Sequence, residues 1–584
     1  MKLRNKVAAL CAAGLLALST IATATPKTLI VGIDGAQYEK MRALNLPTFS
    51  RLYSTVAYTG GVYGSSSQQD TLSGPGWATI LTGVWANKHK ITSNGSGLAD
   101  ANFPSIFKRV RDASPNAYIA SVASWSPIND SFFAKDIARN NLNVTGKSDA
   151  ETINTTLHVL QSTPADLVFV HLSDPDNVAH VHCFGTAYNQ ALATADRQLG
   201  QLLDAVGKRA ASGDDWLVLV TTDHGRQPPS GCNHGGQTTM EKNIFVASNQ
   251  PLNAEFSEYV RVANQDFDGI YGFAAQTSIT PTVLRHMGIE PQPDWLLDGI
   301  PLNGQLGVRK LMGASSTIGD LSWSSTDAGT VTISRGGKTI ASVPARDGHW
   351  RDPAPLNGIN DYTLTLNNTP VSIRQVKREV LMATDWSQDR SYIFLTDGDY
   401  AKYDQKNDRV ANGYPLPVSH STWCGLAPYA NHLVAGFSAS SSIAYFFLDN
   451  GTYLRYDKVR DCVASGYPMN VAGMWPGLGV YARDIRTAVR WSGDKVFFIL
   501  KNGQYIRYDL KQDRMDSGYP QAITDSTWPG VGRYANDIIG ALKWDDTRAY
   551  LFLTGNRYIR YSITNDRAES GPLPMSYWPG LLTN

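Results

Sequence analysis

The first 300 residues alternate between two patterns of apolar side chains. Five short runs are almost continuously apolar: TLIVGID, AYIASVAS, DLVFVHLS, WLVLVTTD and NIFVASN. Such runs predict strands of a sheet that is buried on both faces. Between them, residues 186–210 carry apolar side chains at helical spacing, from Leu192 to Val206. The alternation predicts a doubly wound α/β domain over residues 26–310.

Residues 315–378 change to short segments in which apolar and polar positions alternate, such as GTVTISRGG and DYTLTLNNTPVSIRQV. Gly, Asn and Pro separate these segments, which is the pattern of a small β-sandwich. No constellation in it is typical of a catalytic site. We therefore expect a spacer or packing module.

From residue 380 to residue 584 the chain repeats with a period of roughly 52 residues. GYP occurs three times and degenerates to GPLP in the fourth unit, and a tryptophan follows each: Trp423, Trp475, Trp528 and Trp578. Units of several strands predict a β-propeller, because one such sheet cannot bury both of its faces alone. The YxRYD…DR…GYP…WPGL pattern resembles hemopexin repeats, which implies a four-bladed hemopexin-like propeller. Its role is either binding to a surface, polymer or protein, or that of a rigid stabilising appendage.

The N-terminal 24 residues predict a signal peptide, with three basic residues before an apolar run and Ala-Thr-Ala at the cleavage site. No later apolar run reaches the about 20 residues that span a bilayer. We therefore expect a secreted or periplasmic protein without a transmembrane segment. The net charge of +1 gives no signal for nucleic-acid binding. Four cysteines remain after cleavage, which suggests two disulfides and leaves three pairings open: Cys183, Cys232, Cys424 and Cys462.

The stretch DTLSGPGWATILTG, residues 70–83, predicts a loop that runs into a helix. Pro75 suits a first helical turn, and Gly83 can end the helix. Ser73 then lies at the helix N-terminus, where backbone N–H groups and the helix dipole favour an anion. The alternative is a capping serine without chemistry.

Carboxylates and imidazoles follow several of the predicted strands. Asp34 ends the first strand, DPDNVAH follows DLVFVHLS, DHG follows the next run, and His234 lies shortly after it. In a doubly wound sheet the carboxyl ends of the strands gather the ligand. Carboxylates and imidazoles are typical ligands of zinc, and this chain offers more of them here than one tetrahedral ion needs. We therefore expect two metal ions. Taken singly, each could instead be a turn, cap or surface residue.

These motifs resemble the alkaline phosphatase superfamily, and within it the nucleotide pyrophosphatase/phosphodiesterase branch, over nearly all of residues 27–300. The family nucleophile precedes Thr-Gly by nine residues, which selects Ser73 rather than Thr71. HKITSN matches a family motif through His89 and Asn94, PDNVAH matches Pro-Asp-x-x-Gly-His, and TTDHG matches the second Asp-His pair.

The resemblance implies a complete two-metal site. One ion would be bound by Asp34, Ser73, Asp223 and His224, and the other by Asp176, His180 and His234. Ser73 would be the nucleophile, and Asn94 with the Gly74 N–H would hold a non-bridging oxygen. The ions would be Zn²⁺, with Mn²⁺ as the alternative. Lys90 and Ala179 replace family glycines and His234 comes sooner than in the family, whereas His171 and His182 are expected to be structural.

The residues around Ser73 bear on which ester is cut. Trp77 stands where a sulfatase has an arginine, which disfavours sulfate esters. Trp125 follows a strand end where phosphomonoesterases of the superfamily place cations. We therefore expect hydrolysis of a phosphodiester through a covalent phosphoseryl intermediate. The alternatives are a phosphomonoesterase or phosphonate hydrolase, and a binding protein without catalysis. Because every candidate catalytic residue precedes residue 235, a chain ending near residue 310 is expected to retain turnover.

The predicted ligands also suggest how the cysteines pair. If His180 and His234 bind one ion, Cys183 and Cys232 must come close enough for a disulfide. Cys424 and Cys462 depart together from the repeat consensus, so we expect the second disulfide between them.

Overall fold

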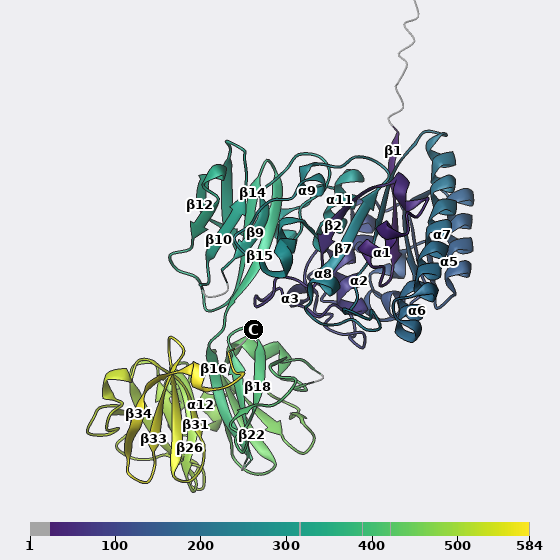
Figure 1. Ribbon diagram of the computed structural model, residues 1–584. Helices are drawn as coiled ribbons and strands as arrows, with labels where there is room; N and C mark the ends of the chain where they lie inside the picture. The colour runs from purple at the N-terminus through teal and green to yellow at the C-terminus, as the bar shows by residue number, and fades with distance from the viewer. Residues whose placement is uncertain (1–23, 315–316, 388, 421, 583–584) are drawn as a thin grey trace, which may run out of the picture. The chain divides into compact units, whose positions relative to one another are not determined.

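The computed structural model describes residues 24–314, 317–387, 389–420 and 422–582 (Figure 1). Internal contacts divide the chain into two compact units. Of the described residues, the first unit comprises those up to Gly60, Asp70–Pro291 and Pro301–Gly304, and the second comprises Gly61–Gln69, Gln292–Ile300 and those from Gln305 onward. The predicted signal peptide, except for Ala24, lies outside the described residues. The domain boundaries near residues 310, 315 and 380 remain predictions.

The first unit is built around an eight-stranded sheet with the order β4-β3-β5-β1-β6-β7-β2-β8. The strands are β1 (Thr25–Ile33), β2 (Tyr53–Tyr58), β3 (Tyr118–Ala123), β4 (Leu142–Thr145), β5 (Ala165–Leu172), β6 (Asp214–Thr221), β7 (Asn243–Ser248) and β8 (Ala274–Ala275). All five strands predicted from apolar runs are present as β1, β3, β5, β6 and β7. The predicted α/β class is thus confirmed, although β7 pairs antiparallel with both β6 and β2. The sheet is therefore mixed.

Helices cover both faces of this sheet (Figure 1). They include α1 (Tyr38–Ala43), α2 (Ser73–Thr82), α3 (Ala86–His89), α4 (Ile106–Ala113), α5 (Asp149–Ser162), α6 (Asp174–His182), α7 (Thr186–Ala210), α8 (Thr239–Lys242), α9 (Ala254–Ser257), α10 (Asp266–Gly269) and α11 (Ile279–His286). Successive strand residues face opposite sides. Val168 and Val170 belong to the core that α7 closes, whereas Phe169 contacts Trp77 of α2. The long amphipathic helix predicted over residues 186–210 is α7.

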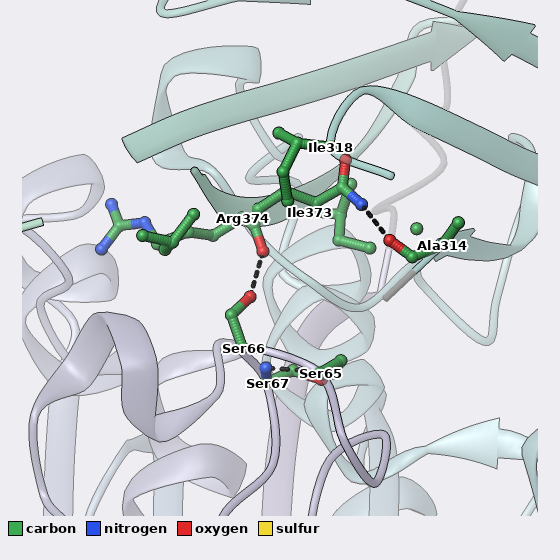
Figure 2. A pocket seen from close by; sticks show the side chains of 10 residues that line it. Ser65, Ser66, Ser67, Ala314, Ile318, Ile373 and Arg374 are labelled. Carbon is green, nitrogen blue, oxygen red and sulfur yellow. Dashed lines mark hydrogen bonds between the residues drawn. The ribbon is translucent and has the colours of Figure 1, made fainter. Parts of the chain in front are cut away.

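Two small sheets and one loop form the next part of the chain. The sheets have the orders β13-β10-β9 and β12-β11-β14-β15. Their strands are β9 (Arg309–Gly313), β10 (Asp320–Ser324), β11 (Thr330–Arg335), β12 (Lys338–Pro344), β13 (His349–Arg351), β14 (Gly358–Leu366) and β15 (Thr369–Lys377). Buried side chains of both sheets, such as Trp323 and Tyr362, share one core. Loop 61–69 lies against β15, where the Ser66 hydroxyl donates to the Arg374 carbonyl at 2.5 Å (Figure 2).

The C-terminal repeats fold into four antiparallel blades. Their strands are β16 (Val380–Ser387), β17 (Arg390–Leu395), β18 (Asp399–Asp404), β19 (Arg409–Val410) and β20 (Leu416–Pro417); β21 (Leu433–Ser438), β22 (Ile443–Leu448), β23 (Thr452–Asp457), β24 (Cys462–Val463) and β25 (Met469–Asn470); β26 (Ile485–Ser492), β27 (Lys495–Leu500), β28 (Gln504–Asp509), β29 (Arg514–Met515) and β30 (Gln521–Ala522); and β31 (Ile538–Lys543), β32 (Arg548–Leu553), β33 (Arg557–Ser562) and β34 (Arg567–Pro574). The first strand of each blade contacts that of the next, and β31 contacts β16. The ring is closed, which confirms the predicted hemopexin-like propeller.

The repeated WPG motif lies at the junctions between blades. The Pro476 and Pro529 carbonyls accept hydrogen bonds from Met515 and Ala568 of the following blade, and the Pro579 carbonyl closes the ring on Val410. At the first junction Cys424 replaces the proline and accepts from Val463. Each motif therefore joins its own blade to a neighbour.

Both predicted disulfides are present, Cys183–Cys232 and Cys424–Cys462. The second joins the first two blades where Cys424 and Cys462 both depart from the consensus. Among the described residues, no helix has the length and apolar character needed to cross a membrane.

Candidate metal centre

Three adjacent strands bring the predicted ligands together. Strand β1 pairs in parallel with β5 on one side and β6 on the other. Their carboxyl ends therefore meet at one edge of the sheet, as expected for a doubly wound fold. Asp34 follows β1, helix α6 follows β5, and the Asp223-His224 pair follows β6. Two groups of side chains that could hold a metal ion lie here: Asp176 with His180 and His234, and Asp34 with Asp176 and His224.

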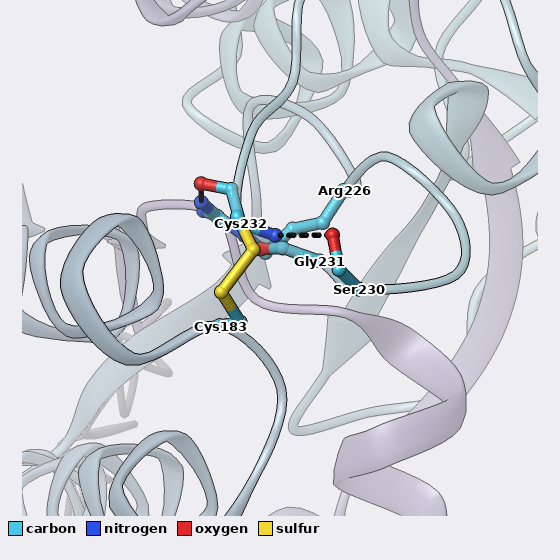
Figure 3. Close-up of a disulfide and its surroundings, with 5 residues drawn as sticks. All are labelled: Cys183, Arg226, Ser230, Gly231 and Cys232. Carbon is cyan, nitrogen blue, oxygen red and sulfur yellow. Dashed lines mark hydrogen bonds between the residues drawn. A yellow bond between two sulfur atoms is a disulfide. The ribbon is translucent and has the colours of Figure 1, made fainter.

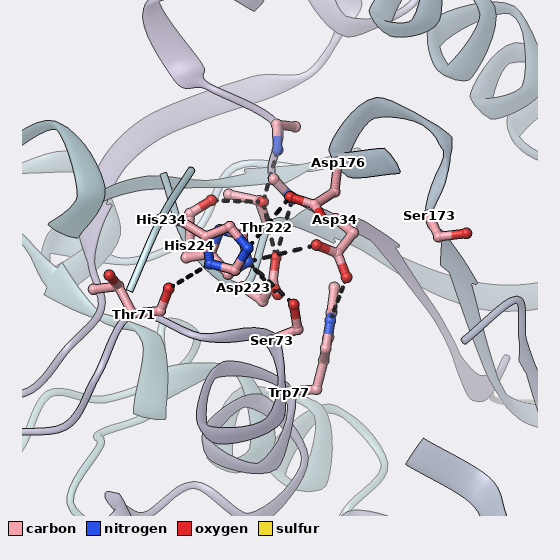
Figure 4. A network of polar contacts seen from close by, with 12 residues as sticks. Asp34, Thr71, Ser73, Trp77, Ser173, Asp176, Thr222, Asp223, His224 and His234 are labelled. Atoms are coloured by element: carbon pink, nitrogen blue, oxygen red, sulfur yellow. Dashed lines mark hydrogen bonds and ion pairs between the residues drawn. The ribbon is translucent and has the colours of Figure 1, made fainter. Parts of the chain in front are cut away.

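Helix α2 presents Ser73 to this edge. As predicted, Pro75 lies in its first turn and Gly83 ends it with a left-handed φ of 75°. Ser73 is the first helical residue, and its Oγ lies 3.2 Å from His224 Nε2 (Figure 4). The Thr71 hydroxyl instead donates to the Gly236 carbonyl at 2.8 Å and accepts from the Gly235 N–H at 3.1 Å. The serine hydroxyl thus faces the ligand cluster, while the threonine hydroxyl is used by a loop.

Oxygen atoms of two aspartates surround the same imidazole. Asp223 Oδ2 lies 3.2 Å and Asp34 Oδ1 lies 3.6 Å from His224 Nε2. Within the described residues, neither oxygen has a hydrogen-bond partner, although both are buried. A buried carboxylate oxygen without a donor is unfavourable unless something else neutralises it. This observation indicates a place for a cation.

The hydrogen bonds of two histidines also indicate a cation site. His224 Nδ1 lies 2.9 Å from the Gly225 carbonyl, and His234 Nδ1 lies 2.9 Å from the Thr71 carbonyl. A ring nitrogen that donates to a carbonyl leaves the other nitrogen as an acceptor, which is how metal-binding histidines are usually oriented. Both Nε2 atoms are thereby available as ligands.

The second group converges on another point. His180 Nε2 lies 3.1 Å from His234 Nε2 and 3.1 Å from Asp176 Oδ2. His180 and His234 come from segments that are far apart in sequence, on α6 and on the loop after β6. The Cys183–Cys232 disulfide joins these segments (Figure 3). The predicted role of this bridge in holding the two histidine loops together is consistent with its position.

Electrostatics also favour a bound cation. Burial and the charge of Asp176 raise the pKa of Asp223 to about 7. Burial likewise raises the pKa of Asp34, and the neighbouring carboxylates raise it further. Burial lowers the pKa of His224, and burial together with His224 lowers that of His234 to about 4. Neutral imidazoles beside carboxylates that repel one another form a donor set that fits divalent metal ions.

The predicted oxygen-binding pair is arranged differently from the expectation. The Gly74 N–H donates to Asn94 Oδ1 at 2.8 Å, so this N–H already has an acceptor. A side chain at Gly74 would collide with the Ser93 carbonyl, which allows the Asn94 loop to approach α2 closely. Asn94 is exposed, and its amide nitrogen has no hydrogen bond within the described residues. Asn94 Nδ2 remains as the available donor.

Three residues support the candidate ligands through contacts that were not predicted from the sequence. Trp77 Nε1 and His171 Nε2 both lie 3.0 Å from Asp34 Oδ2, so they hold that oxygen and leave Oδ1 towards His224. His171 is therefore structural, as expected, but it acts directly on a candidate ligand. Arg226, which is fully buried, forms an ion pair with Asp176. The sequence signal for Arg226 was its place directly after Asp-His-Gly.

Two family models match the first unit. The model described as type I phosphodiesterase/nucleotide pyrophosphatase matches residues 28–148, and the one described as the metalloenzyme superfamily matches residues 136–238. Together they include every predicted site residue. The resemblance predicted from the motifs is therefore confirmed for this segment, and it supports a metal-dependent hydrolase of phosphoric esters.

Curated relatives match only parts of the chain. Matrix metallopeptidase-21 of Danio rerio is 26% identical over 200 residues, which is 33% of this chain and 32% of that protein. A 2,3-bisphosphoglycerate-independent phosphoglycerate mutase of Parasynechococcus marenigrum is 41% identical over 59 residues, 10% of either chain. The chain thus spans about a third or less of these relatives.

Each of the similar solved structures covers only part of the chain. Murine ectonucleotide pyrophosphatase/phosphodiesterase 5 is 14% identical, covers 46% of this chain and 96% of its own, and has a TM-score of 0.34. A plant albumin from Cicer arietinum is 23% identical, covers 34% of this chain and 95% of its own, and has a TM-score of 0.31. A putative sulfatase from Bacteroides thetaiotaomicron is 11% identical over 66% of this chain and 86% of its own, with a TM-score of 0.35.

Proposed function

We propose that this chain is an exported two-metal phosphodiesterase that acts through a covalent phosphoseryl intermediate on Ser73. The observation that carries the proposal is the position of the Ser73 hydroxyl, 3.2 Å from His224 Nε2 at the N-terminus of α2. Ser73 is the first residue of α2, so its hydroxyl lies at the positive end of the helix dipole, which favours an anionic oxygen. The family matches over residues 28–238 support a phosphoric-ester substrate.

The proposed ligands fall into two sets. One comprises Asp34, Ser73, Asp223 and His224, and the other comprises Asp176, His180 and His234. Zn²⁺ suits this mixture of carboxylate and imidazole donors, and Mn²⁺ is the alternative. When bound, the ions would acidify the serine hydroxyl, stabilise the leaving oxygen and draw charge from the phosphoryl group.

The protein contributes orientation and one polar contact. Trp77 and His171 fix the Asp34 carboxylate, and the Thr71 carbonyl fixes the His234 ring. Asn94 Nδ2 is the proposed donor to a non-bridging phosphoryl oxygen, since its Oδ1 is held by the Gly74 N–H. Preorganised donors of this kind act where charge develops in the transition state.

A diester is favoured over a monoester by the charges near the centre. A phosphomonoester dianion is usually held by additional lysine or arginine side chains. Arg226 is fully buried and paired with Asp176, so it is not placed to contact a substrate. Half-buried Trp125 follows β3 and packs against Phe132, offering an aromatic surface for an organic group. A phosphomonoesterase or phosphonate hydrolase would use the same metal core and is the second candidate.

Export and the role of the propeller complete the proposal. Two disulfides are consistent with an oxidising compartment. We propose that the propeller binds a surface, polymer or protein partner and so places the enzyme near its substrate. Its alternative role is stabilisation alone.

The function is tested by replacing the proposed nucleophile. Ser73→Ala should lower kcat on an aryl phosphodiester by about 10⁴-fold or more, because nucleophile loss commonly has effects of this size. Most bound metal should remain, since six other ligands are unchanged. Thr71→Val is the matched control and should lower the rate far less. Rates on diester, monoester and sulfate substrates decide the ester class, and near-native turnover by Ser73→Ala would refute the proposal.

A further inference from the structure

Arg226 is a cation enclosed beside the candidate metal centre. Its side chain is fully buried, and its guanidinium pairs with Asp176 Oδ1. The same guanidinium donates to the carbonyls of Gly231 and Cys232, the latter at 3.0 Å (Figure 3). Its backbone N–H donates to Gln37 Oε1 at 2.9 Å. A buried charge with this many partners is held in one orientation.

The two oxygens of Asp176 have different neighbours. Oδ1 pairs with Arg226 and lies 3.7 Å from His234 Nε2, whereas Oδ2 lies 3.1 Å from His180 Nε2. Arg226 therefore fixes the rotation of the carboxylate about its last bond. The loop that supplies the two carbonyls to Arg226 is tied by Cys232 to Cys183, immediately after the helix that carries Asp176 and His180. The disulfide thus links the loop that binds Arg226 to the end of the helix that carries Asp176.

The turn after β1 closes over this pair. Gly35 has a φ of 59°, and a side chain there would lie 2.6 Å from both the Arg226 guanidinium and Asp176 Oδ1. The left-handed backbone conformation at this position and its close approach to the ion pair both require glycine. The ion pair consequently has no space to rearrange on that side.

We infer that Arg226 is a positioning residue for the metal ion proposed to bind Asp176, His180 and His234. It holds Oδ1 so that Asp176 offers Oδ2 beside His180, and it reduces the repulsion among the three carboxylates of the centre. This inference rests on the proposed two-metal function. Residues that orient a ligand in this way typically change metal affinity about 10- to 100-fold when they are replaced.

The test measures metal binding rather than activity. Apo forms of the full chain are titrated with Zn²⁺ against a chromophoric chelator, and the number of ions per chain is counted by native mass spectrometry. Arg226→Met should weaken one of the two sites by about 10- to 100-fold and leave the other unchanged. Arg226→Lys should restore only part of the affinity, because one ammonium cannot replace the planar fork. Arg139→Met, at an exposed arginine, is the control.

A second variant covers the case in which Arg226→Met does not fold. Gly35→Ala keeps every charge but places a methyl group against the ion pair, and it should weaken the same site. Native affinity at both sites in folded Arg226→Met, or in Gly35→Ala when the former is unfolded, would overturn the inference. If the unaltered chain binds fewer than two ions, the proposed two-metal function fails instead.

Discussion

The propeller and the α/β unit bury polar groups in opposite ways. Each blade buries a tyrosine whose hydroxyl donates to an aspartate five residues later, at 2.8–3.1 Å: Tyr403–Asp408, Tyr456–Asp461, Tyr508–Asp513 and Tyr561–Asp566. The α/β unit instead gathers three carboxylates, of which Asp176 raises the pKa of both Asp34 and Asp223, and two of their buried oxygens lack hydrogen-bond partners within the described chain.

This difference separates stabilising polar groups from functional ones. A pair that repeats in every blade and satisfies its own hydrogen bond contributes to folding. A cluster that occurs once, carries like charges and leaves acceptors unsatisfied is unfavourable by itself and becomes favourable when a cation binds. We therefore expect substitutions in the cluster to change metal binding and rate, and substitutions in the pairs to change stability alone.

After Ser73, the largest expected effect of a ligand change is at His234. His234→Ala should reduce tightly bound zinc from two ions to one and lower kcat/KM by about 1,000-fold. The loss of one ion removes several kcal/mol of charge stabilisation, and each 1.36 kcal/mol corresponds to a tenfold change in rate. His182→Ala, at an exposed histidine beside the same loops, is the control. Elemental analysis and rates on a model diester measure both. Two bound ions in His234→Ala would remove this residue from the ligand set.

Shortening the chain at two positions sharpens the comparison further. A chain ending at residue 378 loses the propeller but keeps β15, on which loop 61–69 rests, and it should keep its kcat/KM. A chain ending near residue 310 also loses β15, and this loop ends only four residues before Ser73. We expect about 100-fold lower activity, because a displacement near 1 Å can have that effect.

Circular dichroism and metal content must first confirm that both shortened chains are folded and loaded. Equal activity of the two would show that the loop needs no anchor. It would agree with the expectation from the sequence that residues up to about 310 suffice for turnover.

His89 predicts a dependence of stability on pH. Its Nδ1 accepts the Ile91 N–H at 3.0 Å, and burial with nearby Lys90 lowers its pKa from 6.5 to about 3. Between these values the unfolded chain binds a proton that the native chain does not, so stability falls as the pH is lowered. From pH 7 to pH 5 the loss should be about 2 kcal/mol.

Urea unfolding of the metal-free protein at both pH values measures this loss. His89→Asn retains an acceptor for Ile91 and should be less stable overall but lose about 2 kcal/mol less between pH 7 and 5. The same substitution at His182 controls for removal of an imidazole. An unchanged pH dependence in His89→Asn would contradict the assignment.

The smallest effect is expected in the propeller. Tyr508→Phe removes one hydroxyl from the pair with Asp513 and should lower the free energy of unfolding of the propeller by about 1.5 kcal/mol. Metal content and kcat/KM should not change. Tyr577→Phe, at an exposed tyrosine, is the control. A fall in activity without a fall in stability would show that the pairs are not purely structural.

Much of the fold was predictable because its signals are local. Continuous apolar runs predict β1, β3, β5, β6 and β7, and the four repeats predict the propeller. The short strands β2 and β4 were missed, since YSTVAY and LNVT are half-exposed and lack a continuous apolar run. Their strand state depends on pairing with distant segments rather than on their own sequence.

The candidate site was predictable where chemistry follows a strand end. Asp34 directly follows β1, Asp223 and His224 lie just beyond the end of β6, and Ser73 begins a helix marked by Pro75 and Gly83. The supporting contacts were not predictable, because Arg226 with Asp176 and the Gly74 N–H with Asn94 depend on how loops meet in space. Whether the Gly74 N–H is free or already hydrogen-bonded is therefore decided by tertiary contacts and not by the local sequence.

The central claim is that the Ser73 hydroxyl attacks the phosphorus atom. The most direct measurement is a single turnover of the zinc-loaded chain with an aryl phosphodiester, quenched with acid and followed by peptide mass spectrometry. The Ser73 oxygen would form the new bond to phosphorus as the aryloxide leaves, so the remaining alkyl phosphoryl group should be found on Ser73. A phosphoryl adduct on Thr71, or full turnover by Ser73→Ala, would contradict the account.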